Sequence, residues 1–159
     1  MSDTEHATLR AEIDAAVDAV GPTLLNVSHA IHERPELAFE EHFACQTLTK
    51  ALRDHALPVK TGVYTLETAF ETTINPDHSG PTVAVLAEYD ALPDIGHACG
   101  HNIIATTALG AALALNTVAS QLPGRVKLLG TPAEERGGGK ELMARAGAFE
   151  GIDAALMIH

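Results

Sequence analysis

The sequence predicts an α/β fold in which a mixed, largely parallel sheet is flanked by helices. From Pro81 onward, apolar strand-like runs alternate with helical segments in the order strand, helix, strand, helix, strand, which is typical of an α/β sheet. The composition is that of a globular chain, because 46% of the 159 residues are hydrophobic and 19% are charged. No internal repeat or linker divides the chain, so we interpret residues 1–159 as belonging to one domain.

Two helical segments are expected before the first strand. Residues 2–33 carry apolar side chains at helical spacing, and the apolar character continues after Gly21-Pro22. Ser2 or Asp3 is expected to cap this first helix. After a turn at Pro35, residues 39–57 show the helical spacing again.

The remaining elements follow from changes in residue type. Residues 59–74 are rich in Val, Thr, Tyr and Phe and predict two strands. The run "TVAVLAEY" at 82–89 is almost wholly apolar, as expected for a strand buried on both faces. Beyond it we expect, in order, a helix at 102–122, a strand at 125–135, a helix at 139–149 and a strand at 153–159.

Charge and composition exclude several classes of partner. The formal net charge of −11 argues against binding to nucleic acid or to an anionic membrane, because such binding needs a basic surface. No stretch reaches the about 18 apolar residues of a membrane span, and the acidic N-terminus does not resemble a signal peptide. Cys45 and Cys99 are too few to form a disulfide framework. We therefore expect a cytoplasmic protein.

Side chains of the kinds that bind metals follow three of the predicted strands. They are Glu88 and Asp90 with His97, Cys99 and His101 in the loop beyond, then Glu134 and Glu135, and finally His159. In an open α/β sheet, binding sites form beyond the carboxyl ends of the strands. The shared position of these side chains predicts a metal site at that edge.

The residue types suit a divalent ion that takes part in hydrolysis. A thiolate, imidazoles and carboxylates are ligands that zinc accepts, and Gly96 and Gly100 allow the turns that bring Cys99 and His101 together. Of two adjacent glutamates at a strand end, one can bind the ion while the other transfers protons. Asp90 suits a role in orienting a metal-binding imidazole.

Other interpretations of single residues remain open at this point. Cys99 beside a histidine can act as a nucleophile instead of a ligand, and His97 can be a ligand or a structural neighbour. Cys45 fits a buried hydrophobic position. The "RGGGK" stretch at 136–140 lacks the spacing of a phosphate-binding loop, because Glu141 follows Lys140; we interpret it as a flexible connection to the next helix.

Four segments in order closely resemble a known superfamily. They are "IHERPELAFEE", "AEYDALPDIGHACGHN", "GTPAEERGGGKELM" and "GAFEGIDAALMIH". They resemble the zinc-dependent aminoacylase, carboxypeptidase and dipeptidase superfamily, in its amidohydrolase branch of hippurate, auxin-conjugate and aminobenzoyl-glutamate hydrolases and Xaa-Arg-type dipeptidases. The resemblance covers roughly residues 24–159 and implies that the chain is the N-terminal part of a metallohydrolase catalytic domain.

The resemblance implies a centre of two divalent ions, zinc or manganese, that hydrolyses amide bonds in N-acyl amino acids or small dipeptides. It assigns the ligands as Cys99, His101, Glu135 and His159, with Glu134 as general base and acid and Asp90 as the carboxylate that orients a ligand.

Two features of the chain depart from the family pattern. Asn102 stands where many members of the branch carry Asp. Residues 1–159 show no counterpart of the family's lid or dimerisation domain or of one further metal-binding histidine, so we expect this segment to form an incomplete catalytic domain. The alternatives are therefore an inactive metal-binding fragment, a homodimer, or a chain that needs a separate C-terminal half.

Overall fold

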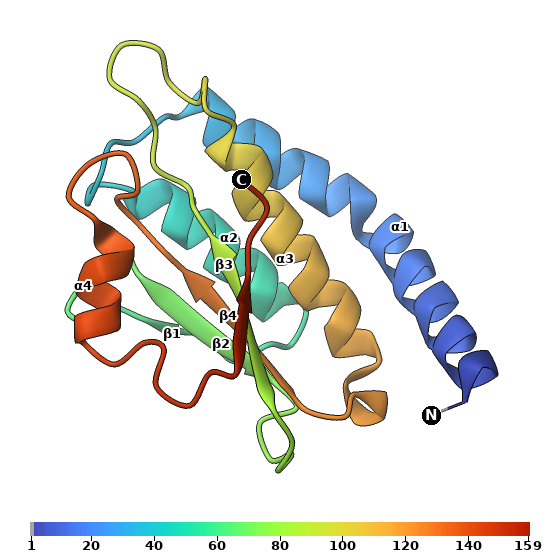
Figure 1. The fold of residues 1–159 in the computed structure, drawn as a ribbon. Coiled ribbons are helices and arrows are strands. Elements are labelled where there is room, and N and C mark those ends of the chain that lie inside the picture. The colour runs from blue at the N-terminus through green and yellow to red at the C-terminus, as the bar shows by residue number, and fades with distance from the viewer. Residues whose placement is uncertain (1) are drawn as a thin grey trace.

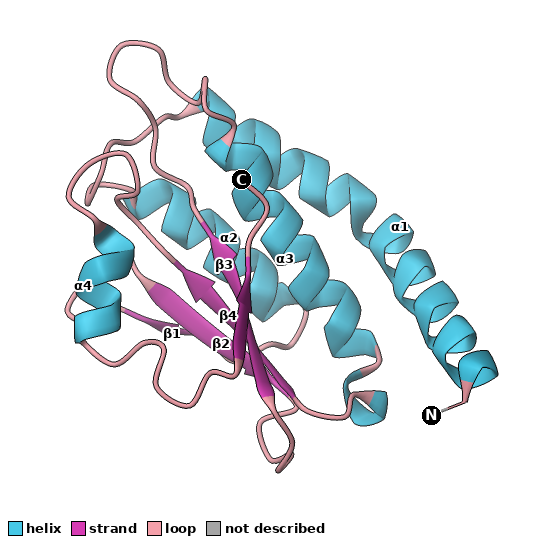
Figure 2. Ribbon diagram, in the orientation of Figure 1, coloured by secondary structure: helices cyan, strands magenta, loops and turns pink. Residues whose placement is uncertain are grey.

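The computed structural model describes residues 2–159. Its helices are α1 (Asp3–Glu33), α2 (His42–Asp54), α3 (His101–Thr117) and α4 (Gly139–Arg145), with a 3-10 turn at Ala119–Gln121. Its strands are β1 (Lys60–Thr61), β2 (Phe70–Ile74), β3 (Thr82–Ala87), β4 (Arg125–Gly130) and β5 (Ala154–Leu156). The predicted order of strands and helices from Pro81 onward is confirmed (Figures 1 and 2).

The sheet is mixed, as predicted, with strand order β1-β2-β4-β3-β5. Strands β4, β3 and β5 run parallel to one another. Strand β2 pairs antiparallel with β4, and the short β1 pairs antiparallel with β2. The parallel part is the part built from alternating strands and helices, since a parallel neighbour requires a crossover connection.

The two crossover helices cover opposite faces of the sheet (Figure 1). Helix α3 packs with α1 and α2 on one face, whereas α4 packs on the other face through Met143. The connections that leave β3 and β4 therefore diverge to opposite sides. Such a divergence opens a crevice at the carboxyl ends of the two strands, and the candidate site lies at that crevice.

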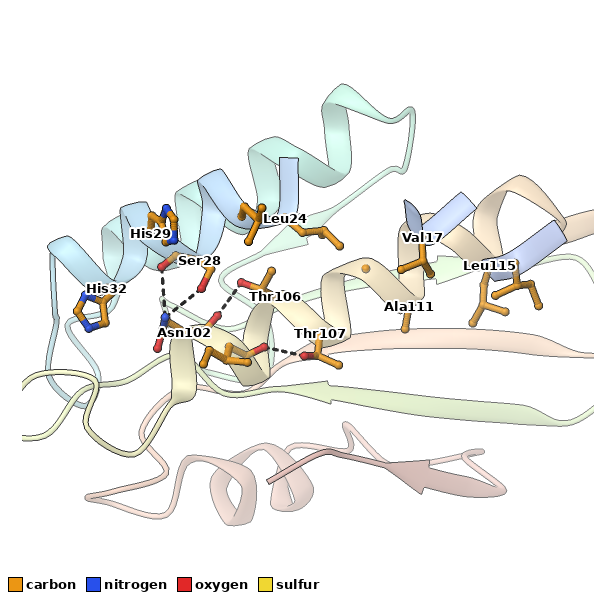
Figure 3. Close-up of a pocket in the computed structure, with 14 residues that line it drawn as sticks. Val17, Leu24, Ser28, His29, His32, Asn102, Thr106, Thr107, Ala111 and Leu115 are labelled. Atoms are coloured by element: carbon orange, nitrogen blue, oxygen red, sulfur yellow. Dashed lines mark hydrogen bonds between the residues drawn. The ribbon is translucent and has the colours of Figure 1, made fainter. Parts of the chain in front are cut away.

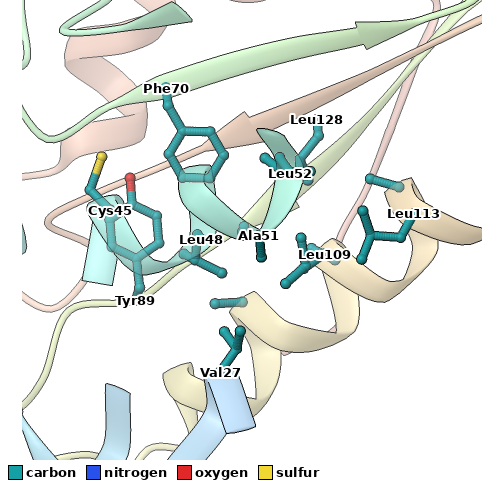
Figure 4. Close-up of a cluster of buried hydrophobic side chains, with 14 of the residues drawn as sticks. Val27, Cys45, Leu48, Ala51, Leu52, Phe70, Tyr89, Leu109, Leu113 and Leu128 are labelled. Carbon is teal, nitrogen blue, oxygen red and sulfur yellow. The ribbon is translucent and has the colours of Figure 1, made fainter. Parts of the chain in front are cut away.

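The main core lies between the sheet and α1, α2 and α3. Phe70 from β2 stacks on Tyr89 beyond β3, with ring centroids 5.8 Å apart. Leu48 and Leu52 from α2 and Leu109 from α3 complete the cluster (Figure 4). This core fixes α3 against β3, and it therefore holds the start of α3 next to the end of the strand.

Helix α1 covers almost the whole segment that was expected to form the first helix. It runs without interruption through Pro22, although proline removes a helical hydrogen bond. Beyond Pro22 the helix packs closely on α3, because a Cβ at Gly110 would lie 2.9 Å from Cδ1 of Leu24. The cap is Ser2, as expected, and Glu5 completes a capping box with it. Within residues 2–159, no helix combines the length and hydropathy of a membrane span.

Candidate metal centre

Three strand ends and one helix start meet at His101. The Nε2 atom of His101 lies 3.5 Å from Oε2 of Glu88 and 3.7 Å from Oε2 of Glu134. Oε1 of Glu135 is 3.9 Å from the same nitrogen. His159, beyond β5, places its ring 5.8 Å from the His101 ring, measured between centroids. The side chains that follow β3, β4 and β5 therefore converge on one point.

These side chains form two groups whose members each offer one ligand atom within 4.8 Å of the others. The first group is Cys99, His101 and Glu135. The second group is Glu88, His101, Glu134 and His159. Both groups contain His101, so the arrangement has the form of two adjoining cation positions.

Asp90 sets the orientation of His101. The Nδ1 atom of His101 donates to the carbonyl oxygen of Asp90 at 2.9 Å and to its Oδ1 at 3.1 Å, which leaves Nε2 with the free lone pair. The other carboxylate oxygen of Asp90 accepts the N–H of Glu135 at 2.9 Å. One carboxylate therefore orients the shared imidazole and anchors the loop that carries Glu135.

Burial and hydrogen bonds act in opposite directions on this pair. Burial alone would raise the pKa of Asp90, but the hydrogen bonds from His101 and the Glu135 N–H outweigh it and lower the pKa. Burial would lower the pKa of His101, but the Asp90 carboxylate raises it above its ordinary value. Burial, assisted by Glu135, raises the pKa of the Cys99 thiol.

Two buried atoms at the centre fit a cation. Oε2 of Glu88 and Nε2 of His101 are both fully enclosed, and neither has a hydrogen-bond partner among the described residues. A buried polar atom without a partner is costly. Thiolate, imidazole and carboxylate are also the donors that zinc accepts. The residues present therefore fit a divalent ion.

Local backbone conformation brings these groups into place. Gly100 adopts φ +85° directly before His101, at the N-cap of α3, a conformation that glycine adopts without steric cost. Gly139 approaches the carbonyl oxygen of Pro132 so closely that a Cβ would come within 1.8 Å of it. Glycine at these two positions keeps the ligand-bearing loops short, because α3 and α4 can begin close to the strand ends.

The structure brings together every residue to which the resemblance assigns a role at the site. Cys99, His101 and Glu135 share one group, and Glu134 and His159 share the other. His97 belongs to neither group; it is buried, and its ring packs against the ring of His32 at 6.5 Å.

Two residues of the centre received no individual role from the sequence: Glu88, which was only part of the predicted strand-end cluster, and Lys140. Glu88 is fully buried, and its Oε1 accepts an ion-pair hydrogen bond from Lys140 at the start of α4. The "RGGGK" stretch therefore ends in a lysine that reaches the site. One sequence signal pointed to Glu88. It is a charged residue that directly follows a buried apolar strand, and it stands two positions before Asp90, on the same face.

Asn102 faces away from the metal centre. Its Nδ2 donates to Oγ of Ser28 at 3.0 Å, which ties the first turn of α3 to α1 (Figure 3). Both residues line an apolar groove of about 910 Å³ between these helices. The departure at this position therefore changes a contact between helices and leaves the ligand set intact.

Comparison with known proteins identifies relatives of the segment that carries this site. Residues 81–159 match the model of peptidase family M20/M25/M40. The chain is 45% identical to the Xaa-Arg dipeptidase of Mus musculus over 92% of its own length and 36% of that protein. It is 33% identical to a p-aminobenzoyl-glutamate hydrolase chain of Escherichia coli, over 92% and 34% of the two chains.

A solved structure shows the same fold. The YXEP protein of Bacillus subtilis, described as a dinuclear metal-binding peptidase of family M20, superposes with a TM-score of 0.79 and 28% identity. The match covers 87% of this chain and 42% of that one. The chain spans about a third of the length of the curated relatives it matches. On this evidence the chain belongs to peptidase family M20/M25/M40.

Proposed function

We propose that the protein hydrolyses amide bonds in N-acyl amino acids or small dipeptides at a centre of two divalent ions. The observation that carries this proposal is the convergence of two ligand groups on the buried, partly unpaired imidazole of His101. The named activities of the relatives, a dipeptidase and an aminobenzoyl-glutamate hydrolase, agree with it.

The proposed ligands are Cys99, His101, Glu135 and His159, and zinc is the proposed metal. A thiolate ligand favours zinc over manganese, whereas imidazole and carboxylate accept both. Glu88 is a further proposed ligand, which is supported by its unpaired Oε2 lying 3.8 Å from Nε2 of His159. When bound, a divalent ion lowers the pKa of water and polarises the amide carbonyl.

Glu134 is the proposed general base and acid. Its side chain is 28% exposed, compared with 0% for His101, so it lies where the buried centre meets solvent. It would take a proton from the attacking water and deliver it to the nitrogen of the leaving amine. Asp90 would hold His101 in the tautomer that presents Nε2 to the centre.

A pair of isosteric substitutions tests these roles. Glu135→Gln should reduce zinc retention after dialysis, because it removes a ligand charge from the group that contains Cys99. Glu134→Gln should retain zinc and lose hydrolysis of N-acetyl amino acids and Xaa-Arg dipeptides, measured on the purified protein. Wild-type protein that retains zinc but hydrolyses neither substrate class would contradict the proposed activity while leaving the metal centre in place.

A further inference from the structure

A buried carboxylate outside the metal centre holds the loop that carries its two glutamates. Glu41, at the N-cap of α2, is 0% exposed and belongs to neither ligand group. We propose that Glu41 is a positioning residue that fixes the backbone at Ala133 and thereby the directions of Glu134 and Glu135. This inference rests on the proposed metal centre.

Both oxygens of Glu41 are used. Oε1 accepts the backbone N–H of Ala133 at 2.8 Å, and Oε2 accepts the hydroxyl of Thr68 at 2.9 Å. Ala133 is itself fully buried and lies 92 positions along the chain from Glu41. A buried N–H needs a partner, and at Ala133 a distant side chain supplies it.

The residue that Glu41 holds has an unfavourable backbone conformation. Ala133 adopts φ +60°, the left-handed region that a residue with a Cβ rarely occupies. The carbonyl of Ala133 is also fixed, because it accepts the N–H of Gly139 at 3.0 Å. Glu134 and Glu135 follow immediately, so a return of Ala133 to negative φ would turn both side chains away from their present positions. Strain of this kind persists only where surrounding contacts enforce it.

The contact requires an acceptor of the right reach more than it requires a charge. Glutamine keeps the reach, because its carbonyl oxygen accepts from Ala133 and its amide group can donate to the Thr68 hydroxyl. Aspartate keeps the charge and both oxygens, but its side chain is one methylene shorter and withdraws from Ala133. The two substitutions therefore separate position from charge.

The test compares Glu41→Gln with Glu41→Asp by zinc titration calorimetry. We expect Glu41→Gln to bind zinc with nearly the wild-type affinity. Glu41→Asp should bind about 10-fold more weakly or worse, as is usual when support for a ligand is lost. Adding Ala133→Gly to Glu41→Asp should recover part of the affinity, because glycine accepts positive φ without strain.

A matched control and a metal-free readout complete the experiment. Ala56 also has positive φ, at 62°, and lies at the end of α2; Ala56→Gly should recover no zinc affinity in Glu41→Asp. Hydrogen exchange of the Ala133 amide in metal-free protein should be faster in Glu41→Asp and unchanged in Glu41→Gln.

Each outcome decides between the two proposals. Equal zinc affinity in wild type and Glu41→Asp, or equal recovery by Ala56→Gly and Ala133→Gly, would overturn the positioning role alone. Wild type that binds no zinc would overturn the metal centre. The exchange rate of the Ala133 amide would then decide whether Glu41 holds the loop.

Discussion

The Nδ1 atom of His101 is 2.9 Å from the carbonyl oxygen of Asp90 and 3.1 Å from its Oδ1. This contact directs Nε2 toward Glu88, Glu134 and Glu135. Because Nε2 has one lone pair, the two ligand groups meet at an atom that binds one ion directly. The hydrogen bonds from Nδ1 to Asp90 therefore determine which nitrogen of His101 faces the centre.

Replacing Asp90 should weaken metal binding. Asp90→Asn keeps one side-chain acceptor in place of two, so either the Glu135 N–H loses its partner or His101 keeps only the Asp90 carbonyl oxygen as an acceptor. We expect zinc affinity to fall about 10- to 100-fold, measured by competition with a chromogenic chelator. Asp153→Asn is the control, because Asp153 also accepts a backbone N–H, from Thr82, but lies outside both ligand groups. Equal losses in the two variants would contradict a specific role for Asp90.

The two thiols should react differently. Burial and the charge of Glu41 raise the pKa of Cys45 to about 11, whereas Cys99 is half-buried at the centre. At pH 8 we expect iodoacetamide to modify Cys99 first and Cys45 only slowly, because the thiolate is the reactive form. Bound zinc should protect Cys99 and leave the rate at Cys45 unchanged. Mass spectrometry of the modified peptides measures both, and unprotected Cys99 would argue against its role as a ligand.

Loss of Lys140 should destabilise the metal-free protein. Lys140→Met leaves the fully buried carboxylate of Glu88 without its ion-pair partner, which should lower the free energy of unfolding by about 3 kcal/mol. Lys50 pairs with Asp54 on the surface, so Lys50→Met should change the free energy of unfolding by less than about 1 kcal/mol. Urea unfolding with and without zinc measures both effects. We expect zinc to restore most of the loss in Lys140→Met, and no recovery would count against Glu88 facing a metal.

The acid limit of stability should depend on Glu71. Burial would raise the pKa of Glu71, but hydrogen bonds from Tyr64 and from the ammonium group of Lys60 outweigh it and lower the pKa. A depressed folded-state pKa stabilises the protein above the unfolded pKa, and this stability is lost as the pH falls through the folded pKa. Glu71→Gln should therefore be less stable at pH 7 by about 1 kcal/mol. Between about pH 5 and pH 3, a range that includes the ordinary glutamate pKa, its unfolding free energy should also fall less steeply than that of wild type.

The predictable parts of the molecule are those with a local signal. The apolar run that includes β3 and the helical spacing of α2 follow from the periodicity of the sequence. The convergence of Cys99, Glu135 and His159 follows from the rule that places sites beyond parallel strand ends.

The contacts that the sequence did not reveal are long-range. Lys140 reaches Glu88 across 52 positions, and Glu41 reaches Ala133 across 92. Neither pairing leaves a periodic trace, because each is set by how α4 and α2 pack on the sheet.

The most direct test of the two-ion centre is zinc content per chain, measured by elemental analysis after dialysis. Wild type should retain more zinc than any variant of a ligand. Cys99→Ala, His101→Ala and His159→Ala should each lose at least one ion, and Cys45→Ala should match wild type. Zinc retention in His101→Ala equal to that of wild type would contradict the two-ion centre, since both ligand groups meet at that residue.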